Sequence, residues 1–139
     1  MNTALDTLLD WYEHLTPQTV CRVPELYAPD AGFRDPFNNV RGTQAIQRIF
    51  EHMFESTSNP RFTIRQRIVQ DEHAFVIWSF DFELLGKAYT VEGASHITFD
   101  SQGLVCMHRD YWDAAEELFQ KLPLVGGFFR LLRRRFASA

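Results

Sequence analysis

Acidic and imidazole side chains occur together near the end of the sequence, in His108-Arg109-Asp110-Tyr111-Trp112-Asp113. In an extended strand alternate side chains point to the same face, so His108, Asp110 and Trp112 would share one face. If that face lines a pocket, the pocket gains a carboxylate and an imidazole, which are the groups used for general acid–base chemistry. The alternative is a structural ion pair, in which Asp110 holds Arg109 or His108 near a sheet edge.

A second carboxylate, Asp35, precedes a proline and is flanked by Phe33 and Phe37. A carboxylate shielded by apolar walls loses hydration, which raises its pKa toward the range useful for acid–base work. If Asp35 and Asp110 share one apolar cavity, simultaneous ionisation is disfavoured, so one becomes a base and the other a neutral acid, and His108 could stabilise either state. Such a trio suits enolisation, dehydration or epoxide opening. The alternative is that Asp35 only organises the turn that follows it.

Helices are predicted in the first half of the chain. Apolar residues at helical spacing predict an amphipathic helix over residues 3–15. A short second helix is predicted over residues 20–27, followed by a turn at residues 28–32. A third helix has Thr43 as its N-cap and ends within residues 56–60. Its apolar face consists of Ile46, Ile49, Phe50, Met53 and Phe54.

The second half of the chain alternates apolar and polar residues, which is the pattern of half-buried strands. Strands are predicted over residues 62–68, 73–85, 88–99 and 104–113. Helices followed by an antiparallel meander are typical of an α+β fold. One face of the second strand is apolar throughout and consists of Ala74, Val76, Trp78, Phe80, Phe82 and Leu84. The helices must cover this face or enclose a cavity with it.

Composition and motifs argue against several classes of protein. The formal net charge is -4, so attraction to nucleic acid is not predicted. Cys21 and Cys106 lack a paired spacing, and there is no His-Glu-x-x-His sequence or glycine-rich phosphate loop, so we expect no metal and no cofactor. The N-terminus has no basic leader, and no apolar run is long enough to span a membrane, which predicts a cytoplasmic protein.

Short motifs carry a family resemblance over residues 3–113. They are YAPDAGFRDP at 27–36, GTQAI at 42–46, FELLG at 82–86, SHITF at 95–99 and GLV at 103–105. Their order and spacing resemble the SnoaL-like and ketosteroid isomerase-like branch of the nuclear transport factor 2-like superfamily. The resemblance implies a domain over residues 1–113, built as a cone-shaped barrel of a curved, mostly antiparallel sheet wrapped by three N-terminal helices. It also implies a hydrophobic pocket, and a homodimer, because members of this fold family often pair through their sheets.

The same resemblance implies roles for individual residues. The carboxylate of the isomerases' Asp-Pro motif is their general base, and Asp35 holds that position. Tyr12 takes the position of their oxyanion-donating tyrosine if one residue is deleted in the following loop, whereas a gapless count puts Trp11 there. Ser95 stands where they have a protonated aspartate, and a hydroxyl cannot act as a neutral carboxylic acid, so steroid isomerisation is not expected. In the SnoaL-like polyketide cyclases a pocket aspartate takes a proton from an activated carbon, and Asp110 is the candidate.

The predicted site therefore has a polar centre and aromatic walls. The catalytic candidates are Asp35, Asp110, His108, Tyr12 and Ser95. The predicted substrate-binding residues are Trp11, Phe33, Phe37, Phe50, Phe54, Trp78, Phe80, Phe82 and Trp112. His96 is expected on the opposite face from Ser95, toward a partner subunit or solvent.

Residues 114–139 are interpreted as a basic, amphipathic helical extension. Bulky apolar residues there accompany Arg130, Arg133, Arg134 and Arg135. The extension is expected to pack across the pocket or onto another subunit, or to lie on a membrane surface with its arginines on anionic headgroups.

Three functional hypotheses follow. The first is a cofactor-free isomerase, cyclase or lyase that abstracts a proton from a small hydrophobic carbonyl compound or lipid-like substrate. Asp35 or Asp110 would be its base, and Tyr12 or Ser95 its hydrogen-bond donor. The second is a non-catalytic module that binds a hydrophobic ligand and contacts a membrane or protein through its tail. The third is a structural homodimer with a vestigial pocket.

Overall fold

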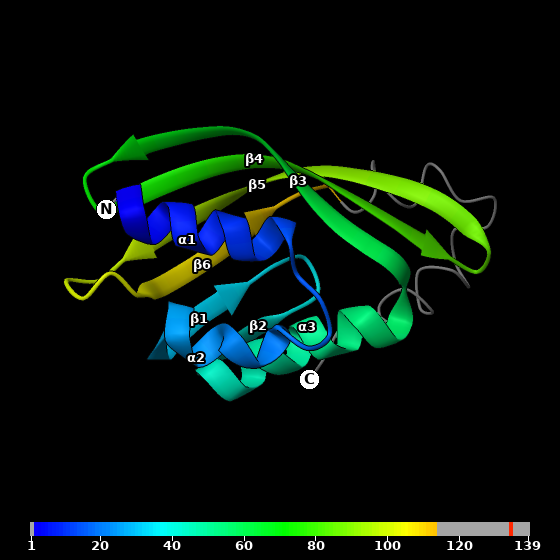
Figure 1. Ribbon diagram of the computed structural model, residues 1–139, viewed down its shortest axis with the longest axis horizontal. Helices are drawn as coiled ribbons and strands as arrows, with labels where there is room; N and C mark the ends of the chain where they lie inside the picture. Colours follow the sequence, from blue (N-terminus) through cyan, green and yellow to red (C-terminus); the bar gives the residue numbers. More distant parts are fainter. Residues whose placement is uncertain (1, 114–133, 135–139) are drawn as a thin grey trace.

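Helices cover one side of a curved sheet in this protein (Figure 1). The computed structural model describes residues 2–113 and 134. Helix α1 spans Asn2–Glu13, a 3-10 turn η1 spans Val20–Arg22, α2 spans Val23–Leu26 and α3 spans Thr43–Ser56. The predicted helices are present, but the second is only a 3-10 turn followed by one short α-helical segment. The N-cap of α3 is Gly42 instead of the predicted Thr43, and the Gly42 carbonyl accepts the first intrahelical bond, from the Ile46 N–H, at 3.1 Å.

Six strands of the described residues form one mixed sheet. They are β1 (Tyr27–Arg34), β2 (Asn39–Arg41), β3 (Ser58–Gln70), β4 (His73–Leu84), β5 (Lys87–Phe99) and β6 (Val105–Tyr111). Their order across the sheet is β2-β1-β6-β5-β4-β3. Strands β1 and β6 run parallel, and all other neighbours are antiparallel. The α+β class and the curved, mostly antiparallel sheet are therefore confirmed.

Strand β1 corrects the predicted turn at residues 28–32. Pro29, Asp30 and Gly32 are turn-forming types, but they lie within the extended strand β1, in which Tyr27 and Gly32 pair with β6 and Gly32 also pairs with β2. The pairing with β6 shifts between Tyr27 and Gly32, so Pro29 lies in an irregular stretch that needs no ladder N–H. Tertiary pairing has overridden local propensity here.

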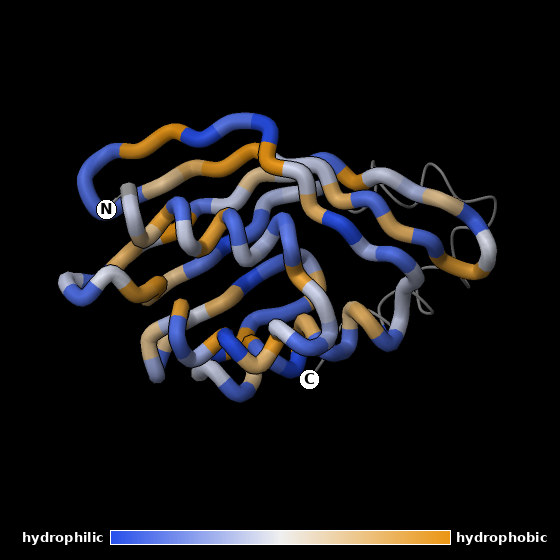
Figure 2. The backbone as a smooth tube through the Cα atoms, viewed as in Figure 1, coloured by the Kyte–Doolittle hydropathy of each residue, from blue (hydrophilic) through white to orange (hydrophobic). Residues whose placement is uncertain are grey.

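The concave face of the sheet forms the core together with the helices. Figure 2 shows hydrophobic and hydrophilic residues alternating along the long strands. On β4 the inward set predicted from the sequence is buried from Ala74 to Leu84, whereas Phe75 and Ile77 on the convex face are 44% and 41% exposed. Helix α1 packs on β3, and α3 packs on both β1 and β3. The predicted extension at residues 114–139 lies, apart from residue 134, outside the described residues.

Candidate active site

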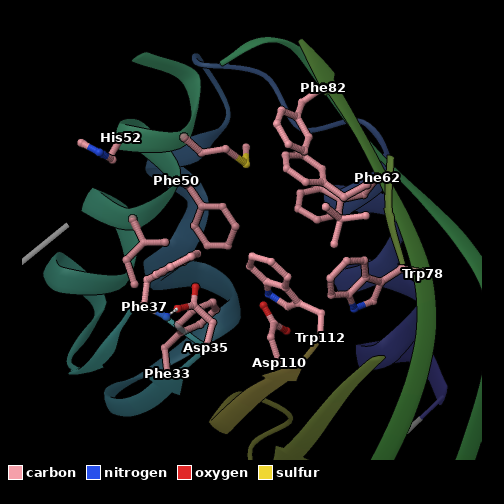
Figure 3. Close-up of a pocket in the computed structure, with 14 residues that line it drawn as sticks. Phe33, Asp35, Phe37, Phe50, His52, Phe62, Trp78, Phe82, Asp110 and Trp112 are labelled. Atoms are coloured by element: carbon pink, nitrogen blue, oxygen red, sulfur yellow. Dashed lines mark hydrogen bonds between the residues drawn. The ribbon is translucent and has the colours of Figure 1, made fainter. Parts of the chain in front are cut away.

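A cavity lies between α3, the concave face of β3–β5 and the ends of β1 and β6. Its water-accessible volume is about 80 Å³, which is room for several water molecules or a small organic group. Figure 3 shows the carboxyl groups of Asp35 and Asp110 at the same end of the cavity. The lining residues that the structure describes are Phe33, Asp35, Phe37, Ile49, Phe50, His52, Met53, Phe62, Trp78, Phe80, Phe82, Val91, Asp110 and Trp112.

Most of the predicted substrate-binding side chains lie in this wall. Phe33, Phe37, Phe50, Trp78, Phe80, Phe82 and Trp112 line the cavity. The structure does not bring Trp11 or Phe54 into the lining. Trp11 turns its indole toward the loop after α1, where its Nε1–H donates to the Thr19 carbonyl at 2.9 Å, and Phe54 packs against the outside of the core. Phe62, which is not among the predicted substrate-binding residues, also lines the cavity and stacks on Phe80 at a centroid distance of 4.5 Å.

Asp35 both organises a turn and faces the cavity. Its Oδ1 accepts hydrogen bonds from the backbone N–H groups of Phe37 and Asn38, at 2.8 and 2.6 Å. Burial, together with the negative charge of Asp110, raises the pKa of Asp35 to about 6, although the bonds from Phe37 and Asn38 act in the opposite direction. The two interpretations of Asp35 are therefore compatible, and its carboxyl group titrates in a range suited to acid–base chemistry.

Asp110 accepts two side-chain hydrogen bonds on a single oxygen. Ser95 Oγ donates to Asp110 Oδ1 at 2.5 Å, and His108 Nε2 lies 2.7 Å from the same atom. Trp78 Nε1 in turn donates to Ser95 Oγ at 2.8 Å. The side chain of Asp110 is only 18% exposed, so these donors stabilise its carboxylate in a largely water-poor place. The proposed His108–Asp110 pair does form, but on an interior strand, since β6 lies between β1 and β5.

Behind Asp110, His108 connects the site to two buried tyrosines. His108 Nδ1 lies 2.8 Å from the Tyr27 hydroxyl and 3.3 Å from the Tyr12 hydroxyl, and the two hydroxyls are 2.5 Å apart. Tyr12, Ser95, His108 and Asp110 line a smaller hollow of about 30 Å³ next to the main cavity. Of the two helix-one candidates, Tyr12 contacts His108, whereas the Trp11 indole bonds the Thr19 carbonyl. The hydroxyls of Tyr12 and Ser95 are engaged inside the protein, so neither is a free donor to a substrate.

The structure also bears on the predictions made for His96, for metal ligands and for membrane-spanning segments. His96 lies on the convex face as predicted, where its Nε2 is 2.9 Å from His73 Nδ1 and its ring stacks on Phe75. Within the described residues, no group of His, Cys, Asp and Glu side chains has the arrangement of a metal site. No helix in the described part of the chain is long and apolar enough to cross a membrane.

This architecture, a curved mixed sheet whose concave face and covering helices enclose an apolar pocket, defines the nuclear transport factor 2-like class of folds. Within that class the chain belongs to the SnoaL-like domain family, whose model matches residues 8–108. No curated protein sequence matches the chain significantly.

Solved structures of distant relatives share the fold. A nuclear transport factor 2-like protein of unknown function from Burkholderia pseudomallei is 18% identical and superposes with a TM-score of 0.73, covering 84% of this chain and 95% of its own. A protein described as a SnoaL-like polyketide cyclase from Jannaschia sp. is 13% identical, with a TM-score of 0.72 and coverage of 83% and 88%. An epoxide hydrolase from M. tuberculosis is 14% identical, with a TM-score of 0.69 and coverage of 94% and 92%. At these identities the likeness concerns the fold.

Proposed function

We propose that this protein is a cofactor-free acid–base enzyme that abstracts a proton from a small, neutral hydrophobic carbonyl compound or a lipid-like substrate, in the manner of an isomerase, cyclase or lyase. The observation that carries the proposal is the placement of Asp35 and Asp110 in one aromatic-walled cavity. The related folds named for a polyketide cyclase and an epoxide hydrolase agree with acid–base chemistry on apolar compounds.

The two carboxyl groups differ in a way that assigns their roles. Asp110 receives hydrogen bonds from Ser95 and His108, which stabilise its charged form as a base. Asp35 has a pKa raised to about 6 by burial and by Asp110, so its protonated form is accessible near neutral pH. Asp110 would take the proton beside a carbonyl, the C–H electrons would form the enol double bond, and Asp35 would give its proton to the carbonyl oxygen.

The cavity wall selects the substrate by charge and shape. None of its described lining residues is Lys or Arg, and Figure 3 shows the His52 imidazole pointing away from the two carboxyl groups. A negatively charged substrate would meet two acids without a cationic partner, which is costly in an apolar site. Trp78, Trp112 and the surrounding phenylalanines instead offer flat apolar surfaces that fit rings and unsaturated chains.

A probe reaction tests for a general base without knowledge of the natural substrate. In the elimination of 5-nitrobenzisoxazole, a base takes the proton on C3, the C–H electrons form a nitrile, and the N–O bond breaks to release a coloured phenolate. We expect the wild-type protein to catalyse this reaction and Asp110→Asn to lose about 100-fold or more of kcat/KM. Asp30→Asn, at an exposed position of β1, is the matched control. Equal rates for Asp110→Asn, Asp30→Asn and wild type would eliminate the proposed role of Asp110.

The convex face of the sheet favours a second, non-exclusive candidate, a homodimeric assembly. Ile68, Phe75, Ile77 and Tyr111 are large apolar or aromatic residues with exposed fractions between 41% and 52%. Phe75 and Ile77 alternate on β4 with the residues of the core, so they lie on the opposite face from the cavity. Pairing of two copies through this face would cover these side chains and leave both cavities intact.

A further inference from the structure

Tyr27 has no role in the proposed reaction steps, although it contacts the site. It is the first residue of β1, it is fully buried, and it is absent from the described lining of both hollows. Its ring is nearly parallel to the imidazole of His108, with an interplanar angle of 14°. Its hydroxyl stands between Tyr12, 2.5 Å away, and His108 Nδ1, 2.8 Å away. Tyr27 therefore acts on the site through His108 and Tyr12, and does not itself line it.

Tyr12, Tyr27 and His108 form a hydrogen-bonded cluster in which each proton can be assigned to a bond. Burial raises the pKa of both Tyr12 and Tyr27, so both phenols keep their protons. One proton fills the bond between the two hydroxyls, and the second needs another acceptor. Among the described residues, the acceptor that contacts both hydroxyls is His108 Nδ1, at 2.8 Å from Tyr27 and 3.3 Å from Tyr12. Whichever phenol donates, Nδ1 must be without a proton.

An unprotonated Nδ1 also fixes the protonation of the other ring nitrogen of His108, Nε2. With Nδ1 acting as an acceptor, the ring proton lies on Nε2, which is 2.7 Å from Asp110 Oδ1. The competing state, an imidazolium paired with the Asp110 carboxylate, would place a proton on Nδ1 and leave a buried phenol proton without its acceptor.

We propose that Tyr27, with Tyr12 behind it, is a positioning residue that holds His108 as a neutral Nε2–H donor to Asp110. The proposal deepens the proposed acid–base function and rests on it for its catalytic consequence. Two chains of donors then converge on one oxygen, from Tyr12 through Tyr27 and His108, and from Trp78 through Ser95. His108 does not itself collect the substrate proton, and Asp110 both takes the proton and returns it.

The tautomer is directly measurable by nitrogen-15 NMR of protein labelled at its five histidines, with His108→Asn identifying the signals of His108. We expect a neutral ring in the wild type, protonated at Nε2 and unprotonated at Nδ1. Tyr27→Phe leaves Nδ1 with the longer contact to the Tyr12 hydroxyl, at 3.3 Å, and should therefore move His108 toward a mixture of tautomers or toward the imidazolium. Tyr111→Phe removes a hydroxyl on the opposite face, where Tyr111 is 49% exposed, and should leave the signals unchanged. A wild-type ring protonated at Nδ1, or identical His108 signals in Tyr27→Phe, overturns the proposal.

A kinetic arm uses 5-nitrobenzisoxazole with the same variants. Because Tyr27 does not line the described cavity, Tyr27→Phe should leave KM unchanged and lower kcat about tenfold, the size of effect that the loss of one ordinary hydrogen bond produces. A rise in KM at constant kcat would contradict a positioning role. If the wild type does not turn over the probe, the proposed function fails for this chemistry while the NMR result still decides the tautomer. Should Tyr27→Phe not fold, the wild-type spectrum still decides, because a ring protonated at Nδ1 overturns the proposal.

Discussion

Asp35 and Asp110 lie at the same end of one aromatic cavity, and the negative charge of Asp110 contributes to the raised pKa of Asp35. Burial is the larger cause, so the two effects can be separated by removing one charge. The pair resembles other sites in which two carboxyl groups divide the roles of acid and base between them.

Asp110→Asn should lower the pKa of Asp35 from about 6 without returning it to its ordinary value. The substitution removes the nearby negative charge but leaves the burial of Asp35 unchanged, and the asparagine oxygen can still accept the bonds from Ser95 and His108. Carbon-13 NMR of the Asp35 carboxyl group during a pH titration measures the change. Asp30→Asn is the control, and an unchanged titration in Asp110→Asn would show that the two groups are not coupled.

Asp35→Asn should stabilise the protein at neutral pH. The pKa of Asp35 is about 6 in the folded state against an ordinary value of 3.8, so the folded state binds this proton more tightly than the unfolded state. Stability therefore falls as pH rises from about 4 to about 6, and the ionised form costs up to about 3 kcal/mol above that window. Urea unfolding between pH 4 and pH 7 should show the advantage of Asp35→Asn growing through the window. An advantage that does not change with pH would contradict the assignment.

The sequence predicts the long strands well because their physical cause is local. Ala74, Val76 and Trp78 alternate with outward residues, and this alternation is the pattern that half-buried strands require. Strand β1 lacks such alternation: its buried residues include the consecutive Tyr27 and Ala28. Only pairing with β2 and β6, which a single sequence does not display, makes this segment a strand.

The candidate site likewise contains residues that local sequence patterns predict and residues that they do not. Asp35, Asp110 and His108 could be predicted because the Asp-Pro motif and the alternation along β6 are local features. The bond between Tyr27 and His108 joins residues 81 positions apart, and it exists because β1 and β6 lie parallel and adjacent. Tyr27 is the last residue of the helix predicted over residues 20–27, so no local pattern indicates a role for its hydroxyl.

Charged substitutions on the convex face should dissociate the proposed homodimer. Ile77→Glu puts a carboxylate in the centre of the exposed apolar patch, and burying it at an interface without a partner costs several kcal/mol. Light scattering coupled to size-exclusion chromatography should then report a dimer for the wild type and a monomer for Ile77→Glu. Gln102→Glu, at an exposed turn, is the matched control. A wild-type protein that is monomeric at all accessible concentrations would contradict the prediction.

Gly93 is required by the position of Trp78 in the cavity wall. The two residues are paired across β4 and β5, and a Cβ atom at position 93 would lie 2.6 Å from the indole ring. Gly93→Ala should therefore displace Trp78, weaken its bond to Ser95, and destabilise the protein by about 1–3 kcal/mol. In Trp78→Phe the smaller ring relieves the contact with the indole, whereas the 3.0 Å approach to the Tyr111 carbonyl oxygen remains, so Gly93→Ala should cost less in that background. Urea unfolding of the two single variants and the double variant measures this coupling, and additive losses would show that the indole does not confine position 93.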